Sequence, residues 1–492
     1  MLLYTLRWTK ERLKFPLYFR LKGNADITER SFVLLNGSSV SFDTYFNSFC
    51  PLKWSLFTEL ENVKLSIRAR GKGKLTIYVR DRHQIQIERE LEFDSIDTVL
   101  DIPFPKSESL VYPELEAKDR LEIQKLEYHT ESPKHYPDLT LVMNTYRRED
   151  FVRSHLVDLK TFIQFHPDLK DKFQMILVDN ASTLGGLSES FLSLIPIREG
   201  SEGCGFTFGI EKVISQQKSS HVCIMEDDVE FDPFFLERLY SFLALLKPEY
   251  HKSIVAGAIL RYDSPLIQHE IGKEFRGYYS KSLLKNKNLS FQENVLQNEG
   301  FQFPKNGFAS WRLVSIPLEL FSEFGQIYPM IFHGYDLEFF LRSRAHFLSL
   351  NGFSVWHEIN DYTREKWFFY YKVINHIILN LIYFPDKKNI FLLFFAYRVL
   401  LDLMLKNKKE ELFWFRKALE DVFMDIEEFK KRSINDILNL KIDDHSEISY
   451  FSEWKYIIGL IYRIIREKSG LRKKFQSILP DLKISPKFTS AK

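Results

Sequence analysis

Three consecutive carboxylates in this chain come directly after a short apolar run. Val222 to Met225 are apolar, and Glu226, Asp227 and Asp228 follow them. Such a run is typical of a buried strand, and its carboxyl end is where open α/β sheets bind ligands. Clustered carboxylates repel one another unless a cation lies between them, and hard divalent cations prefer oxygen ligands. The triplet therefore indicates a divalent-metal site, and an acidic turn before a helix near Asp232-Pro233 is the alternative.

Two other predicted strands also end in polar residues. Leu139 to Met143 is followed by Asn144-Thr-Tyr-Arg-Arg148, and Phe173 to Val178 is followed by Asp179-Asn180. The carboxyl ends of parallel strands share one edge of a sheet. We therefore expect these side chains to lie near the acidic triplet. There they could hydrogen-bond a base and ribose, while the carboxylates hold a metal on a diphosphate.

Four glycines lie between the second and third of these strands, in the segment Glu199 to Gly209. Glycine adopts positive φ readily and lets the backbone approach a ligand closely. The segment predicts a glycine-rich loop at the ligand, and an ordinary flexible turn is the alternative.

The spacing of apolar residues changes twice along the chain. From Ser31 to about Thr130 the apolar residues recur with a period of two, which indicates strands with one buried face. Gly71-Lys-Gly73 interrupts this alternation, and the residues before and after it are expected to form the two strands of a hairpin. From Asp138 apolar runs alternate with helical stretches, and after about Lys372 helical spacing dominates, as in Glu411 to Phe429. The predicted fold class is multidomain α/β + β: an N-terminal β-sandwich (residues 1–135), a Rossmann-like α/β domain (136–378) and an α-helical C-terminal region (379–492).

Composition narrows the classes of protein to consider. The chain has 492 residues and a formal net charge of +2, with 45% hydrophobic and 27% charged residues, as in ordinary soluble proteins. It lacks the concentrated basic charge that nucleic-acid binding requires. Three widely spaced cysteines argue against a disulfide framework and favour a reducing cytosol. The N-terminus does not have the pattern of a signal peptide, so we expect a cytoplasmic protein.

The longest apolar stretch runs from His376 to Leu405, and Pro385-Asp-Lys-Lys388 divides it into pieces too short to span a bilayer. Buried helices are one interpretation, and a helix lying on the inner face of the cell membrane is the other. Three nearby lysines would allow the second: Lys406, Lys408 and Lys409.

Further motifs follow the acidic triplet along the chain, and the order of all the motifs together indicates a family. With them the chain resembles the galactofuranosyltransferase branch of the inverting family-two (GT-A type) glycosyltransferases. The resemblance rests on NTYRRED from Asn144, VDNAS from Val178, the glycine segment at Gly203, MEDDVEFDP from Met225, GAILRYDSPLIQHEIG from Gly257, NGFASW from Asn306, DLEFFLR from Asp336 and VWHE from Val355.

The resemblance implies a role for each matching residue. Glu226, Asp228 and His357 match the metal ligands, expected for Mn²⁺ or Mg²⁺, and Asp336 matches the general base. The implied nucleotide-sugar contacts are Thr145, Arg147, Asp179, Asn180, Gly203 and Asp227. The implied acceptor or sugar contacts are Trp311, Glu338 and Trp356.

The implied activity is transfer of galactofuranose from UDP-galactofuranose onto a glycan acceptor in surface polysaccharide synthesis. The family's acidic triplet is usually all Asp, whereas this one begins with Glu226, and Tyr335 stands where the family has an acid. These departures leave open a rhamnosyl or hexopyranosyl donor. A lectin-like protein with an inactive transferase domain also stays open, as does a nucleotidyltransferase, although the first strand lacks the glycine-rich loop of the latter. A lipid-linked acceptor and a homo-oligomer are not decided by the sequence either.

Overall fold

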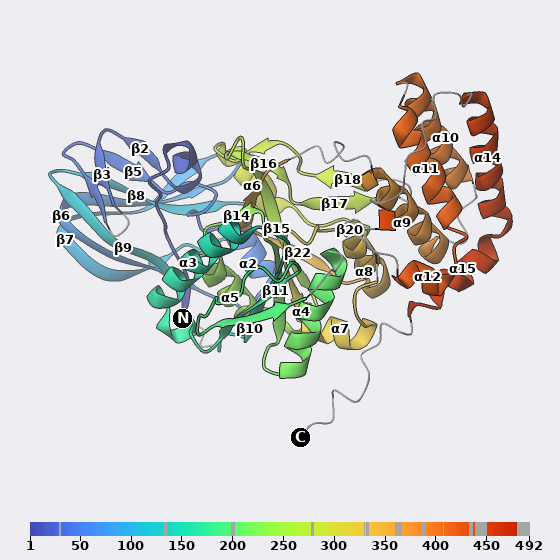
Figure 1. The fold of residues 1–492 in the computed structure, drawn as a ribbon. Coiled ribbons are helices and arrows are strands. Elements are labelled where there is room, and N and C mark those ends of the chain that lie inside the picture. Colours follow the sequence, from blue (N-terminus) through green and yellow to red (C-terminus); the bar gives the residue numbers. More distant parts are fainter. Residues whose placement is uncertain are drawn as a thin grey trace.

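The chain folds as a mixed α/β protein with several sheets and helices. The computed structural model describes residues 1–28, 31–131, 135–197, 202–276, 280–328, 330, 334–359, 367–384, 390–406, 408–431, 436–437 and 450–479. Figure 1 shows an N-terminal sheet at one end, a central α/β region and a group of C-terminal helices at the other end.

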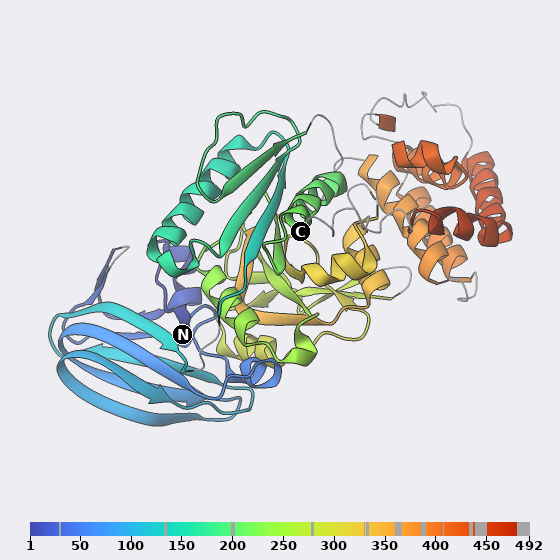
Figure 2. The same ribbon diagram turned by 90° about the horizontal axis from the view of Figure 1, so that it is seen from below.

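The N-terminal part is an antiparallel sheet of nine strands with the order β2-β5-β8-β6-β9-β4-β3, in which β1 pairs with β9 and β7 with β6. The sheet curves strongly (Figure 2). Hydrogen bonds join all nine strands through β6, whose first half pairs with β9 and whose second half pairs with β8. The β-sandwich stays a prediction. The strands are β1 (Leu2–Thr5), β2 (Arg20–Lys22), β3 (Ala25–Ile27), β4 (Phe32–Leu34), β5 (Ser39–Ser41), β6 (Val63–Arg80), β7 (Ile85–Ile102), β8 (Leu110–Ala117) and β9 (Leu121–His129).

The hairpin expected around Gly71-Lys-Gly73 is not formed. Instead β6 runs without reversal from Val63 to Arg80, and the hairpin joins β6 to β7. The register shifts between Arg70 and Gly73, which marks a bulge, and Gly71 has a φ of 110°. A Cβ at Gly71 would lie 2.1 Å from the carbonyl oxygen of Arg120. The glycines therefore bend one long strand, because bulges and turns use the same residue type.

The central sheet has ten strands, and its first four are parallel in the order β12-β11-β10-β13. The strands are β10 (Leu139–Thr145), β11 (Phe173–Asp179), β12 (Leu192–Pro196), β13 (His221–Glu226), β14 (Val229–Glu230), β15 (Ile254–Arg261), β16 (Ile267–Glu270), β19 (Lys287–Asn288), β21 (Leu313–Pro317) and β22 (Phe347–His357). A small sheet of β17 (Gly272–Phe275), β18 (Ser280–Leu283) and β20 (Gly307–Phe308) adjoins it. The predicted strands at Leu139, Phe173, Val222 and Ser253 are thus confirmed within a few residues.

Both faces of the central sheet are buried, which explains its continuous apolar strands. On β10, Leu141 and Met143 join a core that includes α3 (Glu149–Phe165), α5 (Phe235–Leu245) and the N-terminal sheet. Val142, between them, joins a second core with α4 (Glu202–Gln216), α7 (Leu318–Phe324), α8 (Tyr335–Ser343) and the C-terminal helices. The N-terminal sheet and the C-terminal helices therefore take part in two cores that share the central sheet.

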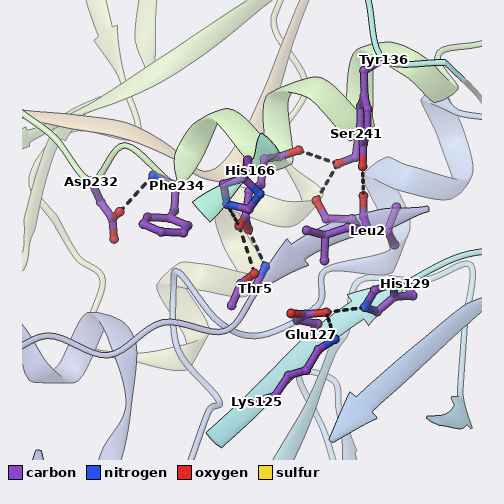
Figure 3. A network of polar contacts seen from close by, with 12 residues as sticks. Leu2, Thr5, Lys125, Glu127, His129, Tyr136, His166, Asp232, Phe234 and Ser241 are labelled. Atoms are coloured by element: carbon purple, nitrogen blue, oxygen red, sulfur yellow. Dashed lines mark hydrogen bonds and ion pairs between the residues drawn. The ribbon is translucent and has the colours of Figure 1, made fainter. Parts of the chain in front are cut away.

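A buried polar network fastens β1 to α5 (Figure 3). The Glu237 carboxylate accepts hydrogen bonds from the backbone N–H of Thr5 at 2.6 Å and from its hydroxyl at 3.0 Å, and lies 2.8 Å from Nε2 of His166. The hydroxyl groups of Ser241 and Tyr136 donate to the carbonyls of Leu3 and Leu2. Buried polar groups must be paired, so this network fixes the position of the first strand against the α/β region.

The C-terminal helices are α9 (Trp367–Tyr383), α10 (Ile390–Leu405), α11 (Lys409–Asp421), α12 (Ile426–Lys431), α14 (Tyr450–Arg466) and α15 (Lys468–Gln476). The boundary predicted at residue 378 falls inside α9. The periodic stretch from Glu411 is divided between α11 and α12, where Lys474 donates to the carbonyls of Val422 and Met424 at 2.5 and 2.7 Å. Among the residues described, no helix has the length and apolarity needed to cross a membrane.

The bulge in β6 generates a stability prediction. Gly71→Ala should lower the free energy of unfolding by about 3 kcal/mol, because a positive φ and a clash with backbone add together. Gly37→Ala is the matched control, since Gly37 also has a positive φ, of 73°, but a Cβ there would meet no atom within 4 Å. It should cost only about 1 kcal/mol. Equal losses for the two variants in urea unfolding would contradict the bulge.

Candidate metal centre

The strand register brings the three predicted strand ends to one edge of the central sheet. Asn144 pairs with Val178 on one side and with Glu226 on the other, and Thr145 pairs with Asp179. Carboxyl ends of parallel strands on both sides of β10 therefore meet at the point where ligands bind in open α/β sheets.

His357 reaches this edge from a distant part of the chain. β22 runs parallel to β15 and also pairs with β14, so that His357 lies opposite Val229, next to Asp228. Its Nε2 is 3.4 Å from Oδ1 of Asp228 and 3.7 Å from Oε2 of Glu226. Ligand atoms of all three residues lie within 4.8 Å of one another. Neighbouring ligand atoms of an octahedral ion lie about 3 Å apart, so a small contraction would close the cluster on a cation.

The donor set fits a divalent metal. His357 is 2% exposed, yet neither of its ring nitrogens has a hydrogen-bond partner among the residues described, and Oδ1 of Asp228 also lacks one. Buried polar atoms without partners cost free energy, and a bound cation would satisfy them. Two carboxylates and an imidazole are suitable ligands for Mn²⁺ or Mg²⁺, with room for diphosphate oxygens and water.

Two arginines that the sequence did not single out contact the triplet. Nη1 of Arg148 is 2.7 Å from Oδ1 of Asp227 and 2.8 Å from Oδ2 of Asp228. Nε of Arg312 is 3.1 Å from Oε2 of Glu226. Arg312 is placed there because β21 runs antiparallel to β13 and its carbonyl accepts a hydrogen bond from the N–H of Glu226. Arg148 could have been noticed beside Arg147, but Arg312 depends on a non-local strand pairing.

The acids of the triplet differ in their affinity for protons. Burial raises the pKa of Glu226, against the opposing effect of Arg312, and burial likewise raises the pKa of Asp227 against Arg148. Burial would also raise the pKa of Asp228, but His357 and the two arginines outweigh it and lower that pKa to about 2. Of the two predicted carboxylate ligands, Asp228 therefore holds a proton less readily than an ordinary aspartate and Glu226 more readily than an ordinary glutamate, so a cation competes with a proton at Glu226.

Asp336 lies in the first turn of α8, and its Oδ1 accepts a hydrogen bond from the N–H of Leu337 at 2.8 Å. Burial raises its pKa, while the charges of Lys273 and Arg312 oppose the rise. Arg312 also lowers the pKa values of Glu226 and Asp228. The charge of Arg312 therefore acts on the pKa values of the predicted metal ligands and of the predicted base alike.

The predicted nucleotide contacts occupy the same edge in different ways. The Asp179 carboxylate accepts hydrogen bonds from the N–H groups of Ala181 and Leu184 at 3.2 and 2.7 Å, so it shapes the loop after β11. Asn180 donates to Oδ1 of Asn144 at 3.1 Å. Thr145 is buried beside Asp227, whereas Arg147 is exposed, with a φ of 54°.

The glycine-rich loop is a correction. Residues from Glu202 onward, including Gly203, form the first turns of α4, and residues 198–201 lie outside the described part. A Cβ at Gly205 would lie 2.0 Å from Oδ1 of Asn144, and one at Gly209 would lie 2.4 Å from Cγ1 of Val142. These glycines let the helix pack closely against β10. As a consequence the N-terminal turn of α4 lies beside Asn144, where the helix dipole favours an anion.

The predicted acceptor contacts are buried. Trp311 is 2% exposed and packs edge-on against Tyr335 and Phe339. Glu338 is fully buried and makes two contacts of 2.9 Å with Arg342. Trp356 is 1% exposed, and its Nε1 donates to the carbonyl of Pro265. In this conformation none of the three presents a surface to a sugar, and their roles stay predictions.

A surface cavity of about 520 Å³ lies at the opposite edge of the sheet, around the amino ends of β10 and β11. Its lining includes Asp138, Lys172 and Lys218. Because none of the predicted site residues lines it, we assign the candidate site to the carboxyl edge.

The raised pKa of Glu226 generates a pH prediction. Without metal, the stability that neutral Glu226 contributes is present at low pH and is lost as the pH rises through its raised pKa. A cation displaces that proton, so saturating Mn²⁺ should raise the Tm more at about pH 7.5 than at about pH 5. Differential scanning fluorimetry measures both shifts, and in Glu226→Gln the difference between them should shrink. An equal or larger shift of the wild-type Tm at the lower pH would contradict the assignment.

A match to a protein-family model bears on the function of the chain. Residues 19–127 match a family model described as galactofuranosyltransferase 2 N-terminal. No curated protein sequence matches the chain. The match lies in the N-terminal sheet and supports a glycosyltransferase.

Solved structures with detectable similarity are distant. A mannosyltransferase from Pyrobaculum calidifontis, solved with GDP-mannose and Mn²⁺, is 13% identical, with 69% of this chain and 90% of that chain covered and a TM-score of 0.32. Mannosyl-3-phosphoglycerate synthase from Rubrobacter xylanophilus is 13% identical over 50% of this chain and 74% of that chain, also with a TM-score of 0.32. At such TM-scores the assignment depends on the geometry of this chain and on the family match.

Proposed function

We propose that the chain is a metal-dependent inverting glycosyltransferase that moves galactofuranose from UDP-galactofuranose onto a glycan acceptor in surface polysaccharide synthesis. The observation that carries the proposal is the cluster of Glu226, Asp228 and His357 at the carboxyl edge of the sheet. The match of residues 19–127 supports the choice of sugar. A binding protein with an inactive transferase domain is less well supported, because the three predicted metal ligands are all retained and lie together.

The donor's diphosphate would lie among positive groups at this edge. Arg148 and Arg312 already compensate the carboxylates there, and the N-terminus of α4 lies beside Asn144. A metal bound by Glu226, Asp228 and His357 would neutralise the charge that develops on the departing UDP. The nucleoside would lie along the ends of β10 and β11, near the Asp179 loop and the exposed Arg147.

Asp336 would act on the acceptor. An acceptor hydroxyl attacks the anomeric carbon as the bond to the diphosphate breaks, and its proton passes to the Asp336 carboxylate. Burial raises the pKa of Asp336, which strengthens it as a base, and the charges of Lys273 and Arg312 oppose this rise. A single displacement of this kind inverts the anomeric centre.

The general-base role generates a kinetic prediction. Asp336→Asn should lower kcat at least about a hundredfold and leave the Kd for the donor nearly unchanged, because only proton transfer is lost. Asp402→Asn is the matched control, since Asp402 forms an exposed ion pair with Lys406 on α10, and it should keep wild-type kcat. Near-normal turnover by Asp336→Asn would rule out this role, as measured by release of UDP.

The choice of sugar has its own test. With Mn²⁺ present, UDP release should be faster with UDP-galactofuranose than with UDP-galactopyranose or a nucleotide-linked rhamnose. Preference for another donor would replace the sugar and keep the reaction class. Absence of turnover with every donor, with and without Mn²⁺, would instead favour a binding protein.

A further inference from the structure

The N-terminal segment contacts β14, the two-residue strand that follows the acidic triplet, and its partner strand β22. Lys14, at the end of the short helix Arg12–Lys14, is 6% exposed. Its Nζ contacts the Glu230 carboxylate and is 2.9 Å from Oε2 of Glu11. It also lies 4.4 Å from the ring centre of Trp356, within the range of a cation–π interaction.

Two of the three partners of Lys14, Glu230 and Trp356, are within two residues of candidate metal ligands. Glu230 and Trp356 are opposite each other in the pairing of β14 with β22, and the preceding pair is Val229 with His357. Asp228 comes directly before Val229. The lysine thus contacts both strands one residue beyond the pair that brings His357 to Asp228.

Other contacts also hold the residues around β14 and β22 in place. In α1 (Phe15–Tyr18), the hydroxyl of Tyr18 donates to Oδ2 of Asp232 at 3.0 Å. Phe46, which also belongs to the N-terminal part, packs against Trp356 with ring centres 5.6 Å apart. The carbonyl of Val229 is 2.7 Å from Nε2 of His155 on α3. Strand β14 has only two residues, so these side chains add to its pairing with β22 in holding it in place.

We propose that Lys14 is a positioning residue, through which the N-terminal domain sets the distance between Asp228 and His357 and so tunes the affinity of the metal centre. This inference rests on the proposed function, because it assumes that these residues bind a metal. It adds that the N-terminal part of the chain helps to position the metal ligands of the α/β region.

The physical reason is that Lys14 is a nearly buried cation, which interacts strongly with the two carboxylates it contacts, those of Glu230 and Glu11. Without its charge, the Glu230 carboxylate would lose a partner beside the acidic triplet and would tend to move toward water. That movement would shift the end of β14 and with it Asp228. Misplacing groups that orient metal ligands typically lowers metal affinity about ten- to a hundredfold.

The test is Mn²⁺ binding to the full-length protein, followed by the electron paramagnetic resonance signal of free Mn²⁺. Lys14→Met keeps the length of the aliphatic chain and removes the charge, and it should raise the Kd about tenfold. Lys14→Arg keeps the charge and should restore the Kd to within about threefold of wild type. The matched control is Lys64→Met, since Lys64 also contacts two carboxylates, Glu131 and Asp101, but on β6 of the N-terminal sheet.

Stability is measured on the same samples by urea unfolding. Lys64→Met should leave the Kd unchanged and alter stability little, because its ion pairs are exposed to water. A Lys14→Met protein that still unfolds cooperatively but binds Mn²⁺ more weakly separates positioning from a general loss of structure. An unchanged Kd in Lys14→Met, while wild type binds Mn²⁺, would overturn this inference and leave the proposed function intact. Failure of wild type to bind Mn²⁺ would instead remove the metal centre on which both depend.

Discussion

Repulsion between three adjacent carboxylates is the constraint around which this site is built. Glu226, Asp227 and Asp228 leave one strand end together, and their charges must be balanced where little water reaches. Arg148 and Arg312 balance part of the charge, and His357 lies within 4 Å of two of the acids. Because the balancing groups come from the start of α3, the start of β21 and the end of β22, the acid cluster depends on most of the central sheet being assembled.

That assembly in turn requires cover on both faces of the sheet. The N-terminal sheet and the C-terminal helices provide it, since the cores on the two faces extend into one or the other. Buried polar groups then fix the geometry that apolar packing leaves loose, as Glu237 does for β1 and Glu338 with Arg342 for α8. The N-terminal sheet and the C-terminal helices therefore support the site. Lys14 is the residue through which the N-terminal part contacts the strands next to the candidate metal ligands.

How far the sequence predicted this structure depended on whether the signal was local. The parallel strands and their shared edge could be predicted, because each strand carries its own apolar run and ends in its own polar residues. The β6 bulge and the start of α4 could not, because glycine suits a turn, a bulge and close packing alike. Arg312, Lys14 and the burial of Trp311 depend on pairings between distant segments, which spacing along the chain does not encode.

The position of the metal tests the central claim most directly. Crystals grown with Mn²⁺ and UDP should give one strong anomalous peak at the manganese absorption edge. The account predicts that this ion is bonded to a carboxylate oxygen of Glu226, to one of Asp228, to a ring nitrogen of His357 and to the diphosphate. A peak bound elsewhere, or UDP bound at this edge without an ion near these three residues, would contradict it.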